Sequence, residues 1–387
     1  MSLFVVGCGR GQLGMVQTQE RRKEPAERIH SGVLKLEFGA EDAFGKELRR
    51  RVDELFRSTG RRKRGGRPMV LKTVIILTWF VASYMLLVFA AQGLWQGLGL
   101  AVLLGLATAA IGMNIQHDAG HGAYSEHAWV NRVMAMTMDL VGGSSYTWRW
   151  KHTVIHHRYV NITGYDTDID IGRLGRYTPE QGRLWYHRWQ HLYLWVFYAF
   201  YGMKVQLVDS WRFALLGRIS RHRIPRPKGA ELVLFLTGKA IFFAWAFAIP
   251  MLLHPVWVVL FYYVVAALML GVVMVLVFIV PHLNAVADFP VPRADTGRMG
   301  NPWMVHQAQV AVDFARHNRV LTWLVGGLNY HKEHHLFPAI CHANYPSLAL
   351  IVEQTCRDFG IPYKEHKSFA AGIAAHYRWL RRMGAAN

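Results

Sequence analysis

Histidines in three clusters are the residues of this chain best suited to chemistry. On a helix, residues three or four apart lie on one face, so each cluster can aim at least two imidazoles in one direction. Neutral imidazole is a common ligand of iron, copper, nickel and zinc. The clusters are box one (His117, His121), box two (His152, His156, His157) and box three (His331, His334, His335).

Eight box histidines are more than one metal ion needs, so the sequence predicts two metals. In box two, His156 and His157 are one residue apart and point about 100° away from each other on a helix. Box two could therefore give His152 and His156 to one metal and His157 to the other, or divide in a similar way. A lone histidine, His282, follows the last long apolar segment and is a candidate ninth ligand, although a capping role is an alternative for it.

Carboxylates near the boxes are candidates to orient the imidazoles, because a metal-bound histidine usually donates its other N–H to a carboxylate or carbonyl. Asp118 and Glu333 lie inside boxes, and Asp166 begins an acidic run with Asp168 and Asp170. The remaining histidines are expected to be surface or packing residues, with His306 the closest to a ligand candidate: His30, His127, His187, His191, His222, His254, His306, His317, His342, His366 and His376.

Four long apolar segments must position the boxes. Each is long enough to cross a hydrocarbon core, which takes about 20 helical residues. We expect transmembrane helices at about 70–92, 94–116, 232–253 and 256–280, paired as two hairpins by short uncharged turns. The predicted fold is an all-α integral membrane protein with a cytosolic helical cap that carries the boxes. Lys239 is the one charge well inside a span, where a lysine can extend to the interface or serve a function.

Charge predicts the orientation of these helices. The formal net charge is +19, and Lys and Arg concentrate in the long loop at about 117–230 and in a basic N-terminal segment, residues 1–68, with a helical pattern from about 43 to 56. Cationic loops stay in the cytosol. We therefore expect both termini and all the boxes on the cytosolic side, with residues 69–387 forming one membrane-embedded domain. The same distribution explains the charge without nucleic acid, and the three cysteines form no metal-binding spacing.

The boxes and the residues that follow them resemble the membrane fatty acid desaturases. The likeness rests on His117-Asp-Ala-Gly-His121, on His152 to His157 with the tail through Asp166, and on Gly326 to Pro338 around box three. Within that family the chain is similar to bacterial acyl-CoA or acyl-lipid desaturases related to the linoleoyl-CoA, or front-end, type. Two features depart from the front-end pattern. Those enzymes usually carry Gln where this chain has His331. Many of them also carry a fused cytochrome b5-type domain with a His-Pro-Gly-Gly motif, which does not occur in this sequence.

The resemblance implies an O2-dependent enzyme with two non-haem irons that introduces a cis double bond into a CoA- or lipid-linked fatty acyl chain. By position, the eight box histidines match the family's ligands and His282 matches an additional one. The expected partners are the acyl substrate, O2, membrane lipids and a separate electron donor, a ferredoxin or a cytochrome b5-type protein, and the expected location is a bacterial inner membrane. The alternatives are a di-iron lipid or alkane hydroxylase and a non-catalytic membrane metal- or haem-binding protein.

Overall fold

A computed structural model of the protein describes residues 36–385 and is mostly helical. Its first half contains β1 (Glu37–Gly39), α1 (Ala43–Thr59), α2 (Arg67–Phe89), α3 (Leu94–Ala110), η2 (Ile111–Gln116), α4 (His117–Gly120), α5 (Ala128–Ala135), α6 (Thr137–Leu140), α7 (Ser145–Trp148), η3 (Arg149–His156), α8 (His157–Tyr159), η4 (Gly172–Leu174), η5 (Trp185–Trp189) and α9 (Gln190–Ala199).

The second half continues with α10 (Tyr201–Lys204), η6 (Val205–Asp209), α11 (Ser210–Leu216), β2 (Arg218–Ile219), β3 (His222–Arg223), α12 (Ala230–Phe243), η7 (Ala244–Ala248), α13 (Ile249–Met251), α14 (Val256–Ile279), β4 (Arg298–Pro302), α15 (Trp303–Val310), β5 (Asp313–Phe314), α16 (Arg319–Leu324), α17 (His331–Leu336), η8 (His342–Asn344), α18 (Tyr345–Asp358), β6 (Glu365–His366) and α19 (Phe369–Gly384). The short strands pair β1 with β4 and β5 with β6 in parallel, and β2 with β3 antiparallel.

Within residues 36–385, four helical runs are long and apolar enough to cross a membrane: Arg67–Phe89, Leu94–Gly120, Ala230–Met251 and Val256–Ile279. Their bounds agree with the predicted spans to within four residues. Much of their surface is uncovered in the isolated chain, where Val74, Leu86 and Val233 are each about half exposed or more. Such surface is stable in lipid and unfavourable in water.

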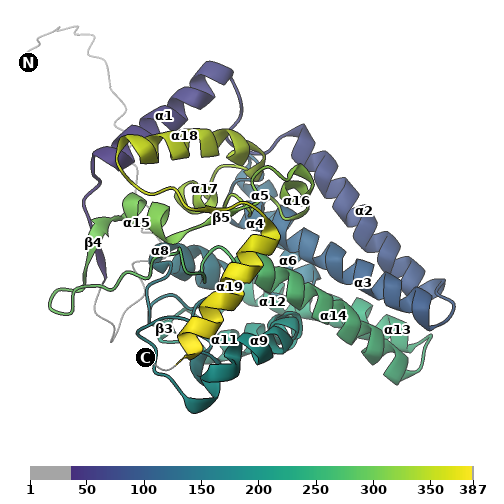
Figure 1. Cartoon of the computed structure of the whole chain (residues 1–387). Helices are drawn as coiled ribbons and strands as arrows, with labels where there is room; N and C mark the ends of the chain where they lie inside the picture. The colour runs from purple at the N-terminus through teal and green to yellow at the C-terminus, as the bar shows by residue number, and fades with distance from the viewer. Residues whose placement is uncertain (1–35, 386–387) are drawn as a thin grey trace, which may run out of the picture.

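The spans pack closely through small residues. Helix α3 lies between α2 and α14, and all three project to one side of the molecule in Figure 1. A side chain at Gly105 would come within 2.4 Å of the backbone oxygen of Ala266 on α14. Glycine therefore lets the two helices approach closely, as is typical of helix contacts in membranes.

The rest of the chain packs against the end of this bundle where the boxes lie. The amphipathic helix α1 buries Phe44, Leu48 and Val52 in a core shared with α15, α17 and α18. Asp42 caps the start of α1 by accepting a hydrogen bond from the backbone N–H of Gly45, at 3.0 Å. Figure 1 shows α1 lying along α18 on the side of the molecule away from the free ends of the spans. The described part of the N-terminal segment therefore contributes to the core around box three.

Candidate metal centre

Four histidines from all three boxes meet in one buried cluster, called group one below. His117, His121, His152 and His334 each offer a ring nitrogen, and these nitrogens all lie within 4.8 Å of one another. The Nε2 atoms of His117 and His152 are 3.1 Å apart. Box one enters this cluster at the end of the run α3–η2–α4, and box three enters it from α17. Histidines separated by more than 200 residues thus share one centre.

A second cluster, group two, contains His156, His282 and His335, whose ligand nitrogens also lie within 4.8 Å of one another. His331 joins them, because its Nε2 is 2.8 Å from that of His282 and 3.1 Å from that of His335. The Nε2 atoms of His282 and His335 are 3.2 Å apart. His282, the lone histidine that follows α14, therefore lies among the box residues.

The histidines of box two lie in both groups. His152 belongs to group one and His156 to group two, although the nitrogens of these two histidines also lie within 4.8 Å of each other and of an Asp168 oxygen, so the expected pairing of His152 with His156 stays open beside this division. Residues Arg149–His156 form a π-helix, in which residues five apart, rather than four, are joined by hydrogen bonds. His157 is accordingly beside His152, with 3.2 Å between their Nε2 atoms. The ring centroid of His157 lies 4.5 Å from that of His121 in group one and 4.5 Å from that of His335 in group two. His157 thus lies between the two groups.

Three mutual contacts in group two cannot all be hydrogen bonds. The Nε2 atom of a neutral imidazole either donates or accepts, so among three such atoms at least two must have the same role. The atoms of His282, His331 and His335 form such a triangle, with sides of 2.8, 3.1 and 3.2 Å. In addition, Nδ1 of His331 donates to the carbonyl of Leu328 at 3.0 Å. In the neutral ring, Nε2 of His331 therefore carries no proton and can only accept. A cation among the three atoms would satisfy all of them at once.

The protonation states of these rings favour a metal. Burial lowers the pKa of His152, His157, His282, His334 and His335 well below 6.5, and lowers that of His121 and His331 to about 3. These imidazoles are therefore neutral near pH 7, which is the form that binds a metal. Nε2 of His121 and Nε2 of His334 are buried without a hydrogen-bond partner among the described residues. Buried polar atoms without partners are costly, so the donor set fits bound cations.

Asp166 is the predicted carboxylate that contacts a box imidazole. Its two oxygens lie 3.0 and 3.2 Å from Nδ1 of His156, which leaves Nε2 of that ring facing group two. Burial alone would lower the pKa of His156, but the carboxylates of Asp166 and Asp168 outweigh it and raise the pKa above 6.5. A metal would displace the Nε2 proton while Nδ1–H stays bound to Asp166.

Asp118 and Glu333 have different partners from those expected. An oxygen of Asp118 accepts from Nδ1 of His342 at 2.9 Å, and Nζ of Lys72 lies 2.9 Å from the other nitrogen of that ring. Glu333 accepts from the hydroxyl of Tyr363 at 3.0 Å. Among the hydrogen bonds of residues 36–385, neither carboxylate bonds directly to a box histidine.

Two glycines bring the boxes together. Gly326, shortly before box three, has φ of +63°, and a side chain there would come within 2.2 Å of the carbonyl oxygen of Met113 on η2. Only glycine combines that backbone conformation with so close an approach. Gly120 lies against the indole of Trp148, whose ring is tilted 30° from that of His152 with 4.7 Å between centroids. Trp148 thus covers group one from the side of α7.

Three polar residues outside the predicted ligand set join backbone segments that are distant in sequence. His306 is a buried packing residue, as expected, and its Nε2–H donates to the carbonyl of Val160 at 2.9 Å. Gln307 donates to the carbonyl of His157 at 3.0 Å. Lys239 is buried and donates to the backbone carbonyls of Gly142 and Gln206, so it does not extend to an interface. These roles depend on segments that meet only in the fold, and spacing along the chain carries no signal for them.

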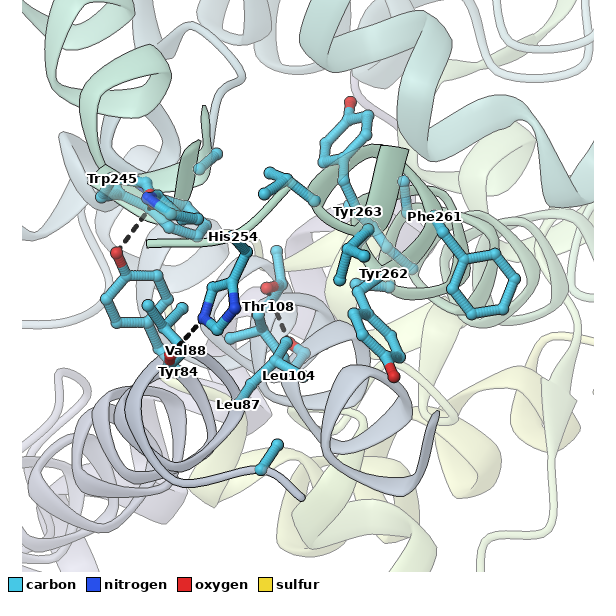
Figure 2. A pocket seen from close by; sticks show the side chains of 18 of the residues that line it. Tyr84, Leu87, Val88, Leu104, Thr108, Trp245, His254, Phe261, Tyr262 and Tyr263 are labelled. Carbon is cyan, nitrogen blue, oxygen red and sulfur yellow. Dashed lines mark hydrogen bonds between the residues drawn. The ribbon is translucent and has the colours of Figure 1, made fainter. Parts of the chain in front are cut away.

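An apolar cavity of about 560 Å³ lies between the spans (Figure 2). Its lining includes Leu104 and Thr108 of α3, Trp245 of η7, and Tyr262 of α14. Many of its polar groups are already bonded within the protein: the Tyr84 hydroxyl donates to the Trp245 carbonyl at 2.8 Å, and Thr108 donates to the carbonyl of Leu104 at 2.8 Å. The cavity therefore offers hydrocarbon surface with little demand for polar partners.

Comparison with known proteins identifies the family. The model of the fatty acid desaturase family matches residues 93–367. An sn-1 linoleoyl-lipid 6-desaturase from Arthrospira platensis is 37% identical over 91% of this chain and 96% of its own length, and one from Synechocystis sp. is 35% identical over 91% and 99%. An acyl-lipid (8-3)-desaturase from Physcomitrium patens is 31% identical over 92% of this chain and 75% of its own length. The chain thus belongs to the fatty acid desaturase family of membrane oxidoreductases, within its front-end acyl-lipid branch.

Proposed function

We propose that this desaturase acts on linoleoyl chains carried by membrane lipids and introduces the new double bond at carbon 6, at a centre of two non-haem irons. The substrate and position follow the names of the two relatives that match nearly full length on both sides. The observation that supports the metal centre most strongly is the convergence of nine imidazoles, eight of them buried and His121 partly buried, into two adjoining groups.

The proposed ligands divide between the irons by their geometry. One iron would be held by His117, His121, His152 and His334, and the other by His156, His282, His331 and His335. His157, which lies between the groups, is assigned to the first iron because its Nε2 is 3.2 Å from that of His152. Two bound irons would supply the O2-dependent oxidation of an unactivated C–H bond, which no side chain can perform.

The contribution of the chain itself is to position the substrate and exclude water. The cavity between the spans suits the methyl end of the acyl chain, since both are apolar. Its lining residue Thr108 lies nine residues before His117 along one helical run, or about 13 Å at the rise of an α-helix. A tail anchored there would leave a fixed length of chain to reach the irons, which would set the carbon that is oxidised.

The proposed topology places the two pairs of spans as hairpins, with the basic segment 1–68, the boxes and both termini in the cytosol, and the spans in a bacterial inner membrane. Desaturation removes two hydrogen atoms from the substrate, which is two electrons and two protons, and reduction of O2 to two waters needs four of each. A separate donor, a ferredoxin or a cytochrome b5-type protein, would supply the other two electrons, and water would supply the other two protons. The cationic loop around Arg221 and Arg223 would attract an acidic donor.

Expression in a host whose lipids contain linoleate but no 6-unsaturated acid tests this function. Gas chromatography with mass spectrometry of the fatty acids should show a product two hydrogens lighter, with the new double bond at carbon 6. His156→Ala should abolish it, whereas His127→Ala, an exposed histidine outside both groups, should retain it. A product that gains one oxygen would instead indicate a hydroxylase, and continued desaturation by His156→Ala would refute the ligand assignment.

A further inference from the structure

Asn161, four residues after box two, adopts a backbone conformation that is unusual for a residue with a side chain. Its φ is +57°, in the left-handed region, and the residue is fully buried. Asparagine tolerates this region better than most residues, but glycine adopts it with no steric cost. The presence of a buried side chain where glycine would suffice for the backbone suggests that the amide has a task of its own.

The side-chain amide of Asn161 joins three segments that are distant in sequence. Its Nδ2 lies 3.1 Å from the carbonyl oxygen of His282, 3.1 Å from that of Asp288 and 3.3 Å from that of Val310. Carbonyl oxygens only accept, so the two N–H groups of one amide serve three acceptors. The backbone at His282 is thereby fixed relative to the segment that follows box two.

The backbone of Asn161 reaches the other side of group two. Its N–H donates to Asp166 at 2.9 Å, and the same carboxylate bonds to Nδ1 of His156. A single residue thus contacts the carbonyl of one group-two histidine and the carboxylate that orients another. Within residues 36–385, no hydrogen bond of Asn161 reaches a member of group one.

We propose that Asn161 is a positioning residue for the metal of group two: it sets the distance between His156 and His282, and without its amide that metal binds more weakly while the affinity for the metal of group one is unchanged. This inference rests on the proposed two-metal centre. The amide acts through the orientation of two imidazoles and is not itself a ligand. The neighbouring hydrogen bonds from His306 and Gln307 hold the backbone at Val160 and at His157 of box two, but neither reaches His282.

The test compares Asn161→Gly with the wild-type full chain in detergent. Glycine keeps the left-handed backbone without strain and removes only the amide. Gln190→Ala is the matched control, because the Gln190 amide is equally buried and donates to the carbonyls of Arg176 and Leu380, neither of which belongs to either group. Metal-free protein is titrated with Co²⁺, and the stoichiometry and visible d–d absorption are recorded, with near-ultraviolet circular dichroism as the measure of folding.

Wild type and Gln190→Ala should each bind two Co²⁺ per chain. Asn161→Gly should bind one tightly, with the second Kd raised by at least about 10-fold, as is typical when a group that orients a ligand is removed. Two equally tight sites in Asn161→Gly, or parallel weakening of both, would overturn the inference. Misfolding of both Asn161→Gly and the isosteric Asn161→Asp while Gln190→Ala folds would also overturn it, since Asn161 would then be needed for stability in general. Failure of the wild type to bind two ions would instead refute the proposed centre.

Discussion

A buried chain of three polar side chains links helix α2 to box one. Nζ of Lys72 lies 2.9 Å from Nε2 of His342, and Nδ1 of His342 lies 2.9 Å from Asp118, which adjoins the proposed ligand His117. Lys72, His342 and Asp118 are 7%, 5% and 2% exposed, so water hardly screens them. Lys72 compensates the carboxylate charge through the intervening imidazole.

Lys72→Met should therefore destabilise the protein strongly. Methionine has a similar length and suits an apolar helix, so the main effect is to leave Asp118 without its balancing cation. Removing one partner of a buried ion pair costs about 3–5 kcal/mol. For a chain of this length about 2 °C of melting temperature corresponds to each kcal/mol, which predicts a fall of about 6–10 °C.

The assay is thermal unfolding of the metal-free protein in detergent, followed by circular dichroism at one fixed scan rate. Lys46→Met, at an exposed site on α1, is the control and should change the melting temperature by less than about 2 °C, because surface substitutions are nearly neutral. Adding Asp118→Asn to Lys72→Met should recover about 1–3 kcal/mol relative to the sum of the single effects. A melting temperature unchanged by Lys72→Met, or strict additivity of the two substitutions, would refute the charge-compensation argument.

Three further predictions concern the groups, their titration and the cavity. Asp166→Asn should weaken binding of one of the two metals by about 10–100-fold in a chelator competition, because His156 loses its carboxylate, and leave the other unchanged. Burial lowers the pKa of His306 and His376 to about 4, so between pH 6.5 and pH 4 the unfolded chain binds more protons than the folded protein. The free energy of unfolding of the metal-free protein, measured by denaturant titration, should therefore be highest above pH 6.5 and fall as the pH is lowered toward 4. Ala246→Trp should fill part of the cavity and reduce desaturation of 18-carbon chains more than that of 14-carbon chains in product analysis.

The membrane helices could be predicted from sequence because their signal is local. Runs of uncharged residues predicted spans at 70–92, 94–116, 232–253 and 256–280, and the helices lie at 67–89, 94–120, 230–251 and 256–279. An apolar segment of this length forms a helix in lipid whatever it packs against, because its backbone hydrogen bonds must be satisfied within the segment. Lys239 was the exception, because its partners, the carbonyls of Gly142 and Gln206, are brought to it only by the fold.

For the candidate site, the sequence singled out the histidines that lie together in the fold but not their arrangement. Residue type and spacing identified all nine histidines that converge, and the acidic run after box two supplied Asp166. The position of His157 beside His152 accompanies the π-helical turn of box two, which α-helical spacing does not anticipate. The role of Asn161 could not be inferred from sequence either, because its amide bonds to carbonyls more than 100 residues away.

The central claim is that the nine histidines hold two irons side by side. An anomalous difference map at the iron absorption edge, from crystals of the protein purified with its native metal, tests it directly. Two peaks are expected, one among His117, His121, His152 and His334 and the other among His156, His282, His331 and His335. A single peak shared by both groups, or iron bound elsewhere in the chain, would contradict it.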